Sequence, residues 1–275
     1  RGDKGIGKEI VRKLVMMPGM GTVIIGCRTQ QLGEVAAAEI RGTRGRSGGA
    51  NVVVKRLDLT DAESIAELQE YLATSLGRLD VLVNNAAVCF NDPTLYGKVP
   101  HTPFAAQAGV TLDTNFFGTL AVTRAMLPLL RASTSPDSPS RIVNVASAAG
   151  RLRGSRDKTN ALTSDALTVP VLEDLMRDFV KDAEAGVHEA RGWPNTCYGV
   201  SKMGVIALTR VLARDEPGIM VNAVDPGYCK TDQNANQGPV SPERGAETAA
   251  MLAAALPAAG FKSGGFWYEE KEISW

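Results

Sequence analysis

Short apolar runs alternate with helix-like apolar patterns along this chain. Five runs rich in Val and Ile are apolar at successive positions, which is typical of strands buried on both faces in a parallel sheet. These runs span residues 22–27, 51–57, 80–85, 141–147 and 219–224. Between them, apolar residues recur every three or four positions, as from Ile65 to Leu76, which indicates helices with one buried face. The alternation predicts an α/β fold, a Rossmann-like doubly wound parallel sheet flanked by helices.

Glycine and basic residues near the strand ends are the first candidates for a site, because ligands of such sheets bind beyond the carboxyl ends of the strands. Gly5 and Gly7 stand at a helix start, where backbone amides and the helix dipole favour a phosphate. Arg28 follows the run 22–27, where an NAD-specific enzyme carries a carboxylate. Together with Lys4 it is suited to a 2′-phosphate. The alternative is that both basic side chains face solvent.

Tyr198 and Lys202 stand four residues apart after a Trp-Pro pair that ends any preceding helix, so they share one helix face. Reduction of a ketone needs a proton delivered to the oxygen as it becomes an alkoxide, and Tyr198 can supply it. We expect the neighbouring ammonium of Lys202 to lower the pKa of this phenol. Taken alone, such a pair is more often a surface contact, and only the surrounding motifs favour chemistry.

Composition narrows the class of protein. The 275 residues are 44% hydrophobic, enough for one large core, so we expect a single domain over residues 1–275. Thirty basic and thirty acidic side chains cancel, and the basic, Gly-rich stretch 41–51 is typical of a solvated loop, which argues against nucleic acid or membrane partners. Four scattered cysteines and two histidines predict a reduced, cytoplasmic protein without a metal site.

Several motifs together resemble one family. They are KGIG, LDVLVNNAA, TNFFGT, RIVNVAS, YGVSK and DPGYCKTD, in that order. This set is similar to the classical short-chain dehydrogenase/reductase family, and the resemblance runs from Lys4 to Trp275. Two longer stretches, FVKDAEAGVHEARGWPNTCYGVSKMGV and SPERGAETAAMLAAALP, resemble its NADPH-dependent carbonyl reductase branch. The resemblance implies reduction of ketones, aldehydes and quinones to alcohols by hydride transfer from NADPH.

The resemblance also implies four catalytic residues. Tyr198 is the expected proton donor, and Lys202 stabilises its phenolate and holds the nicotinamide ribose. Ser147 is placed to donate to the carbonyl oxygen together with Tyr198. Asn115 matches the fourth member, whose backbone positions a water that relays protons to the lysine. Asn115 and the nearby Gly118 are also poor helix formers inside a long helical pattern, and such breaches often accompany function.

Cofactor and substrate residues follow from the same matches. Asp58 resembles a residue that meets the adenine, and Pro226, Gly227 and Thr231 resemble a loop that fixes the nicotinamide carboxamide. The residues expected to contact NADPH are Lys4, Gly5, Ile6, Gly7, Arg28, Asp58, Asn85, Ala86, Ala87, Tyr198, Lys202, Pro226, Gly227 and Thr231. Those expected to line the substrate pocket, because they flank the catalytic positions, are Gln107, Ala148, Ala149, Trp193 and Tyr228.

Three features depart from the family. The usual NNAG reads NNAA, and an alanine at position 87 fits only if its backbone avoids positive φ. Asp225 replaces a small uncharged residue, and its carboxylate either weakens nicotinamide binding or points outward. The chain starts at Arg1, where the family has a glycine after a first strand. We expect this central strand to be missing from the sequence, through truncation or incompleteness, with unpaired backbone groups and a gap as the result.

The 51 positions from Ser147 to Tyr198 exceed the usual family spacing. The additional length, about residues 151–194, contains apolar residues at helical spacing from Leu172 to Ala183 and predicts an amphipathic helix. In the carbonyl reductase branch this insertion covers the helices that otherwise pair into tetramers, so the resemblance implies a monomer. Two other functions stay open: a catalytically silent NADP-binding scaffold, and an alcohol or steroid dehydrogenase working in the oxidative direction.

Overall fold

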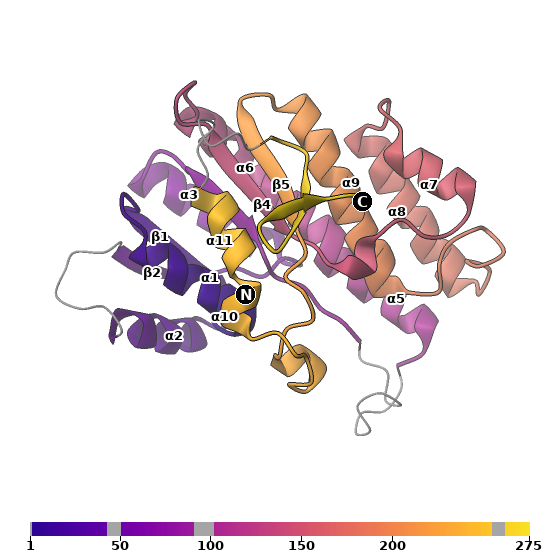
Figure 1. The fold of residues 1–275 in the computed structure, drawn as a ribbon, viewed down its shortest axis with the longest axis horizontal. Helices are drawn as coiled ribbons and strands as arrows, with labels where there is room; N and C mark the ends of the chain where they lie inside the picture. Colours follow the sequence, from indigo (N-terminus) through magenta and orange to yellow (C-terminus); the bar gives the residue numbers. More distant parts are fainter. Residues whose placement is uncertain (1, 43–50, 91–101, 255–261) are drawn as a thin grey trace.

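The computed structural model describes residues 2–42, 51–90, 102–254 and 262–275, and it arranges them as a layer of strands between two layers of helices (Figure 1). The Gly-Arg-rich stretch 41–51, predicted to be a solvated loop, lies mostly outside these residues. None of the helices in the described part of the chain is long and apolar enough to span a membrane.

All five predicted runs form strands, which confirms the α/β fold. The strands are β1 (Thr22–Cys27), β2 (Asn51–Arg56), β3 (Val81–Asn84), β4 (Ser140–Val145), β5 (Ile219–Val224), β6 (Phe266–Tyr268) and β7 (Lys271–Ile273). β1 pairs with β2 in parallel, whereas β3, β4, β5 and β6 form a second parallel set to which β7 adds an antiparallel edge. β4 and β5 are buried along their whole length, because helices cover both of their faces.

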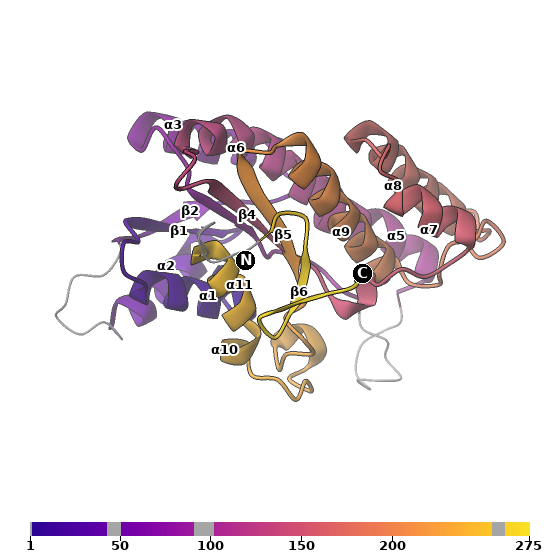
Figure 2. The same ribbon diagram turned by 45° about the horizontal axis from the view of Figure 1, so that its top comes forward.

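The helices divide between the two faces of the sheet. They are α1 (Gly5–Met16), α2 (Gln30–Gly42), α3 (Ala62–Ser75), α5 (Phe104–Leu112), α6 (Thr119–Ser133), α7 (Arg156–Thr163), α8 (Val169–Glu184), α9 (Cys197–Asp215), α10 (Pro242–Gly245) and α11 (Glu247–Ala254). Short 3₁₀ turns, η2 (Ala148–Gly150) and η3 (Asp232–Asn234), follow β4 and β5, and a π-helical turn, η1 (Asp113–Gly118), joins α5 to α6. Figure 2 shows α3, α6 and α9 on one face, and α1, α2 and α11 on the other.

Buried polar side chains fix the strands relative to the helices behind them. The Asn84 side chain donates to Asn144 Oδ1 (2.8 Å) and to Thr123 Oγ1 (3.1 Å). Asn144 in turn donates to Thr209 Oγ1 of α9 at 2.9 Å. Because each buried donor finds an acceptor, the network ties β3, β4, α6 and α9 together without leaving polar groups unpaired. It therefore holds the helix that carries Tyr198 in register with the strand that leads to Ser147.

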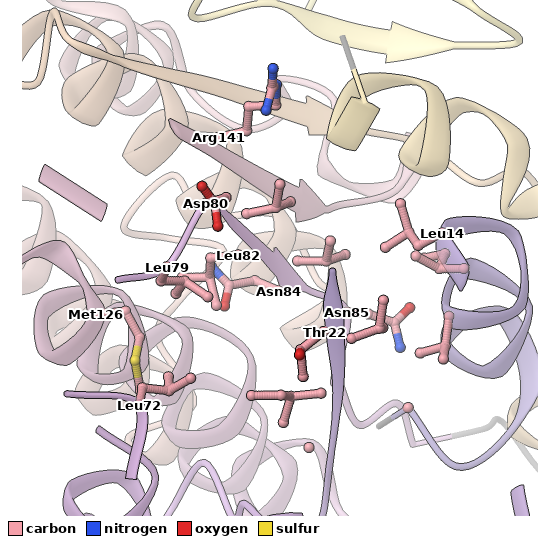
Figure 3. Close-up of a pocket in the computed structure, with 18 of the residues that line it drawn as sticks. Leu14, Thr22, Leu72, Leu79, Asp80, Leu82, Asn84, Asn85, Met126 and Arg141 are labelled. Atoms are coloured by element: carbon pink, nitrogen blue, oxygen red, sulfur yellow. The ribbon is translucent and has the colours of Figure 1, made fainter. Parts of the chain in front are cut away.

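A cavity of about 650 Å³ separates β1 from β3, which are not hydrogen-bonded to each other. Figure 3 shows Thr22 of β1 and Leu82 of β3 on its walls, with Leu14 and Met126 from helices on either side. The missing first strand expected from the sequence stays a prediction. The four predicted catalytic residues are not among its lining residues, whereas Gly7, Asn85 and Ala86 of the predicted cofactor set are.

The predicted amphipathic helix is α8. Its buried residues Leu172, Met176, Phe179 and Ala183 follow the predicted apolar stripe. Thr168 caps the helix, its side chain accepting from the backbone nitrogen of Val171. α8 packs against α5 and α9, at the far end of the molecule from β1 and α2 (Figure 1).

Candidate active site

Tyr198 and Ser147 come together at the carboxyl end of β4. Tyr198 lies in the first turn of α9, which is capped by Thr196 through a 3.0 Å hydrogen bond from the backbone nitrogen of Gly199. Ser147 follows β4 and caps η2, its hydroxyl accepting from the backbone nitrogen of Ala149 at 3.2 Å. The phenol of Tyr198 and the hydroxyl of Ser147 are hydrogen-bonded. Two residues that are 51 positions apart in the sequence thus meet at one point.

Lys202 lies one turn further along α9 and is buried. Its Nζ donates to the carbonyl oxygen of Val145 at 2.7 Å and lies 5.6 Å from the centroid of the Tyr198 ring. Burial lowers the pKa of Lys202 to about 8, because removal from water penalises the ammonium. The three predicted groups Ser147, Tyr198 and Lys202 therefore form one cluster, in which the pKa of the lysine is well below its ordinary value.

The acidity predicted for the phenol is wrong for this arrangement. Burial raises the pKa of Tyr198, and the ionisable groups of Cys89 and Asp225 raise it further. Hydrogen bonds from Ser147 and Gln233 act in the opposite direction but do not outweigh the loss of water. The prediction relied on the Lys202 ammonium, but its Nζ donates to a backbone carbonyl oxygen and its charge does not offset the burial of the phenol. Tyr198 accordingly keeps its proton to higher pH than free tyrosine.

Asn115 is held in η1, where π-helical geometry replaces the predicted regular helix. Its side chain accepts from the backbone nitrogen of Val88 (2.8 Å) and donates to the carbonyl oxygen of Val88 (2.9 Å). The same amide donates to Ser201 Oγ of α9 at 3.0 Å. Gly118 is required because a Cβ there would lie 2.7 Å from the carbonyl oxygen of Leu59. Asn115 thus ties the segment after β3 to the helix that carries Tyr198.

The start of α1 lies at the carboxyl end of β1, as predicted for a phosphate site. The backbone nitrogen of Gly2 donates to the Gly26 carbonyl oxygen at 3.1 Å, and Gly5 adopts a positive φ of 53°. The N-cap residue Lys4 makes no side-chain capping hydrogen bond to the first amides of this helix, which suits them to an external anion. A Cβ on Gly5 would lie 3.4 Å from Thr231, which brings two predicted cofactor contacts side by side. Ile6, in the first turn, packs against the adjacent apolar core.

A second, smaller cavity of about 60 Å³ lies beyond the ends of β1, β2 and β3. Its lining includes four of the predicted cofactor residues: Arg28, Asp58, Ala86 and Ala87. Asp58 Oδ1 accepts from the backbone nitrogen of Thr60 at 3.1 Å, which fixes its carboxylate at the cavity. Asn85 borders the larger cavity instead (Figure 3). The two basic residues also differ, since Lys4 pairs with Asp232 at 2.9 Å in an exposed ion pair, whereas Arg28 lines the cavity.

Two departures from the family have local explanations. Ala87 is not among the described non-glycine residues with positive φ, so its backbone meets the condition set for alanine. Asp225 is buried, and its Oδ1 accepts from the backbone nitrogen of Gly227 at 3.0 Å. The carboxylate therefore neither points outward nor lacks a partner. It stabilises the turn formed by Pro226 and Gly227, two of the predicted cofactor residues.

The predicted substrate residues do not all lie beside Ser147. Ala148 and Ala149 lie in η2 beside Ser147, and Tyr228 is half exposed on the loop after β5. Gln107 donates to the carbonyl oxygen of Thr102 at 2.6 Å, at the start of α5. Trp193 is buried, and its indole nitrogen donates to Asp182 Oδ2 at 3.1 Å. This placement within the insertion does not support Trp193 as a pocket wall.

Two residues near the phenol were missed by the sequence analysis. Gln233, in η3, is hydrogen-bonded to Tyr198, and Cys89, just after the NNAA motif, influences the pKa of both Tyr198 and Lys202. The position of Cys89, two residues after the NNAA motif, was the signal from which its place near the site could have been inferred. Gln233 gave no signal, because the motif that resembles the family ends at Asp232. Within the described residues, no group of three or more His, Cys, Asp or Glu side chains is placed to hold a metal ion.

Comparisons with known proteins show the family of the chain. The short chain dehydrogenase family profile matches residues 2–158, and the profile of enoyl-(acyl carrier protein) reductase matches residues 185–256. The chain is 37% identical over 285 residues to NADPH carbonyl reductase 1 of Homo sapiens, covering 100% of this chain and 96% of the relative. It is 39% identical over 266 residues to NADPH carbonyl reductase 3 of Mus musculus, covering 93% and 89%.

Solved structures are similar over the whole length as well. Salutaridine reductase from Papaver somniferum matches with a TM-score of 0.82 and 31% identity, covering 97% of each chain. Menthone neomenthol reductase from Mentha piperita matches with a TM-score of 0.79 and 29% identity, covering 98% of this chain and 96% of that one. The similarity therefore includes the start of α1, the end of β4 and α9, where the candidate residues lie.

Proposed function

The chain belongs to the short-chain dehydrogenase/reductase family, in its NADPH-dependent carbonyl reductase branch, and we propose that it reduces ketones, aldehydes and quinones to alcohols with Tyr198 as proton donor. It is an NADPH-dependent oxidoreductase. The observation that carries the proposal is the hydrogen bond between Tyr198 and Ser147 beside the buried ammonium of Lys202. A hydroxyl pair next to a positive charge is suited to an oxygen on which negative charge develops.

The residues at the start of α1 fit the cofactor. The uncapped amides of α1, with the positive φ of Gly5, suit the pyrophosphate, and the small cavity lined by Arg28, Asp58 and Ala87 suits the adenosine part. Arg28 is the residue we assign to the 2′-phosphate. The exposed ion pair of Lys4 with Asp232 is weak enough to open, which leaves Lys4 as a second partner for that phosphate. NADPH, when bound, supplies the hydride.

The catalytic residues have separate tasks in this proposal. The Ser147 hydroxyl donates to the carbonyl oxygen and orients it, and the Tyr198 hydroxyl delivers the proton to that oxygen. Lys202 stabilises the phenolate that remains, through its charge 5.6 Å from the ring centroid. Asn115 acts at a distance, because its bonds to Val88 fix the segment that leads from β3 into the site.

Tyr198 keeps its proton at neutral pH and can therefore act as the acid in carbonyl reduction. The same residues serve the reverse reaction, so an alcohol or steroid dehydrogenase stays an alternative. The silent-scaffold alternative loses part of its support, because the Asp225 carboxylate is engaged in the turn at Gly227.

Two further properties are proposed with this function. The chain is a monomer, because α8 covers α5 and α9. It acts in the cytoplasm, where thiols stay reduced; the four cysteines, Cys27, Cys89, Cys197 and Cys229, are all free.

Small alanines at positions 148 and 149 suit bulky carbonyl compounds.

Replacement of Tyr198 by phenylalanine tests the proposal. We expect Tyr198→Phe to lower kcat/KM for NADPH-dependent reduction of a quinone and aromatic ketone panel by about 100-fold to 10,000-fold, because the proton donor is lost. The affinity for NADPH, measured by fluorescence titration, should stay within about twofold, since one hydroxyl contributes little to a large ligand surface. Tyr71→Phe is the matched control, since Tyr71 lies in α3 under Lys55. Equal turnover by Tyr198→Phe and the control contradicts the assignment, and NADPH binding without turnover by the unaltered chain favours the scaffold.

A further inference from the structure

Three arginine side chains follow the catalytic serine along the chain. Arg151, Arg153 and Arg156 are exposed, and within the described residues none has a hydrogen bond or ion pair through its guanidinium. Asp157, the acidic neighbour in sequence, is likewise without an ion pair to them. We call these three residues the arginine segment.

Arginines elsewhere on the surface differ from this segment. Arg124 pairs with Glu173 at 2.6 Å, and Arg244 pairs with Glu270 through both terminal nitrogens at 2.7 and 2.9 Å. The protein as a whole has equal numbers of acidic and basic side chains. The arginine segment is therefore a local excess of positive charge on a neutral molecule, and its guanidinium groups have donors available for an external anion.

The arginine segment borders the catalytic cluster. At one end, a Cβ on Gly150 would lie 2.8 Å from the backbone carbon of Lys202. At the other end, the backbone nitrogen of Ser155 donates to the carbonyl oxygen of Gly192 at 2.8 Å, just before α9. The stretch between these two contacts therefore passes the start of α9, where Tyr198 lies.

The positive charge does not serve helix stability. Arg156 is the first residue of α7, and Lys158 lies in the same first turn. Cations there oppose the helix dipole, so these residues destabilise α7 slightly. Lys158 has a partner, since its ammonium lies 4.1 Å from the centroid of the Trp193 ring, whereas Arg156 does not.

The arginine segment lies at the opposite end of the sheet from the residues proposed to bind the phosphates of the cofactor. Lys4 and Arg28 lie at α1 and β1, at one end of the sheet, whereas α7 lies at the opposite end (Figure 1). A ligand that reaches the arginine segment from the catalytic cluster must extend away from α1. In the proposed function, this direction leads away from the cofactor and is left for the substrate.

We propose that Arg151, Arg153 and Arg156 select carbonyl substrates that carry an anionic group, a carboxylate or a phosphate monoester, away from the reacting carbonyl. The inference rests on the proposed reductase function, because it names the substrate class of the same site. Guanidinium groups bind such anions through paired N–H donors. Their field also raises the local concentration of anionic substrates at the entrance, an effect that salt screens.

A matched pair of substrates tests this selection. We expect kcat/KM with NADPH to be about tenfold higher for 4-carboxybenzaldehyde than for its neutral methyl ester, the equivalent of roughly 1.4 kcal/mol. The ratio should fall towards one in the triple variant Arg151→Gln, Arg153→Gln and Arg156→Gln. It should also fall in the unaltered chain at about 0.5 M NaCl, roughly three times physiological ionic strength, because salt screens the charges of the arginines. The control variant replaces the exposed Lys181, Lys262 and Lys271 by glutamine, removing the same charge elsewhere, and should leave the ratio unchanged.

Binding of the two products gives a readout that does not need turnover. In the presence of NADP⁺, calorimetry should show tighter binding of 4-(hydroxymethyl)benzoate than of its methyl ester, and the triple variant should lose this difference. Equal binding of both alcohols by the unaltered chain, or a preference that survives the triple variant, overturns the inference. Absence of reduction with a preserved binding preference contradicts the reductase function alone, so the two failures are distinguishable.

Discussion

At the scale of single residues, Asp225 combines two effects that can be separated. Its Oδ1 accepts from the backbone nitrogen of Gly227, and this contact needs an acceptor but no charge. Its negative charge adds to the effect of burial in raising the pKa of Tyr198. Burial and the same charge together raise the pKa of Cys229 to about 11. Asparagine keeps the acceptor and removes the charge, whereas alanine removes both.

We expect Asp225→Asn to shift the pH dependence of carbonyl reduction. The reductive kcat/KM falls at high pH in two steps, the first as Lys202, with a pKa of about 8, loses its charge, and the second, at higher pH, as Tyr198 loses its proton. Without the neighbouring carboxylate the pKa of Tyr198 is lower, so the second step should move to lower pH than in the unaltered chain, as measured by pH–rate profiles with NADPH. Asp225→Ala should show the same shift together with weaker NADPH binding from the loosened turn. An unchanged profile for Asp225→Asn means that the phenol does not sense this charge.

At the scale of elements, the segment from α5 through η1 to α6 shows what a local pattern can and cannot reveal. Asn115 and Gly118 stand out in the sequence because both are poor helix formers. The reason for each is a residue distant in sequence: Val88 bonds to Asn115, and Leu59 leaves no space for a Cβ at position 118. Periodicity predicts that a helix exists here, but only the tertiary contacts explain its π-helical turn.

Two glycines of this segment give a matched stability test. A Cβ at Gly118 would lie 2.7 Å from Leu59, so Gly118→Ala should lower the free energy of unfolding by about 1–3 kcal/mol through overpacking. A Cβ at Gly109 in α5 would meet only Glu184 Oε1 at 3.9 Å, so Gly109→Ala should raise it by about 0.5–1 kcal/mol through better helix propensity. Urea denaturation measures both. Equal stabilisation by the two alanines contradicts the close contact at Leu59.

At the scale of the whole molecule, the sequence predicted strands β1 to β5, the amphipathic helix α8 and the meeting of Ser147, Tyr198 and Lys202, because strand order places their elements at one edge. It did not predict the acidity of the phenol, which depends on burial and on Asp225 and therefore on distances absent from any local pattern. The exposed pair of Lys4 with Asp232 joins residues 228 positions apart, and no spacing rule reaches that far. The described strands form two separate sheets, because β1 and β3 are not hydrogen-bonded to each other, and this arrangement also depends on the whole molecule.

The covering of α5 and α9 by α8 leads to the prediction of a monomer. α8 buries Leu172, Met176 and Phe179 against the neighbouring helices, so these faces are not available for a second copy. Sedimentation velocity should give a single species of monomer mass across a wide concentration range. Phe179→Asp places a charge at a fully buried position and should displace α8, giving larger species as the covered faces become exposed. Val171→Asp, at a half-exposed position of α8, should sediment like the unaltered chain, and a stable dimer or tetramer of the latter contradicts the prediction.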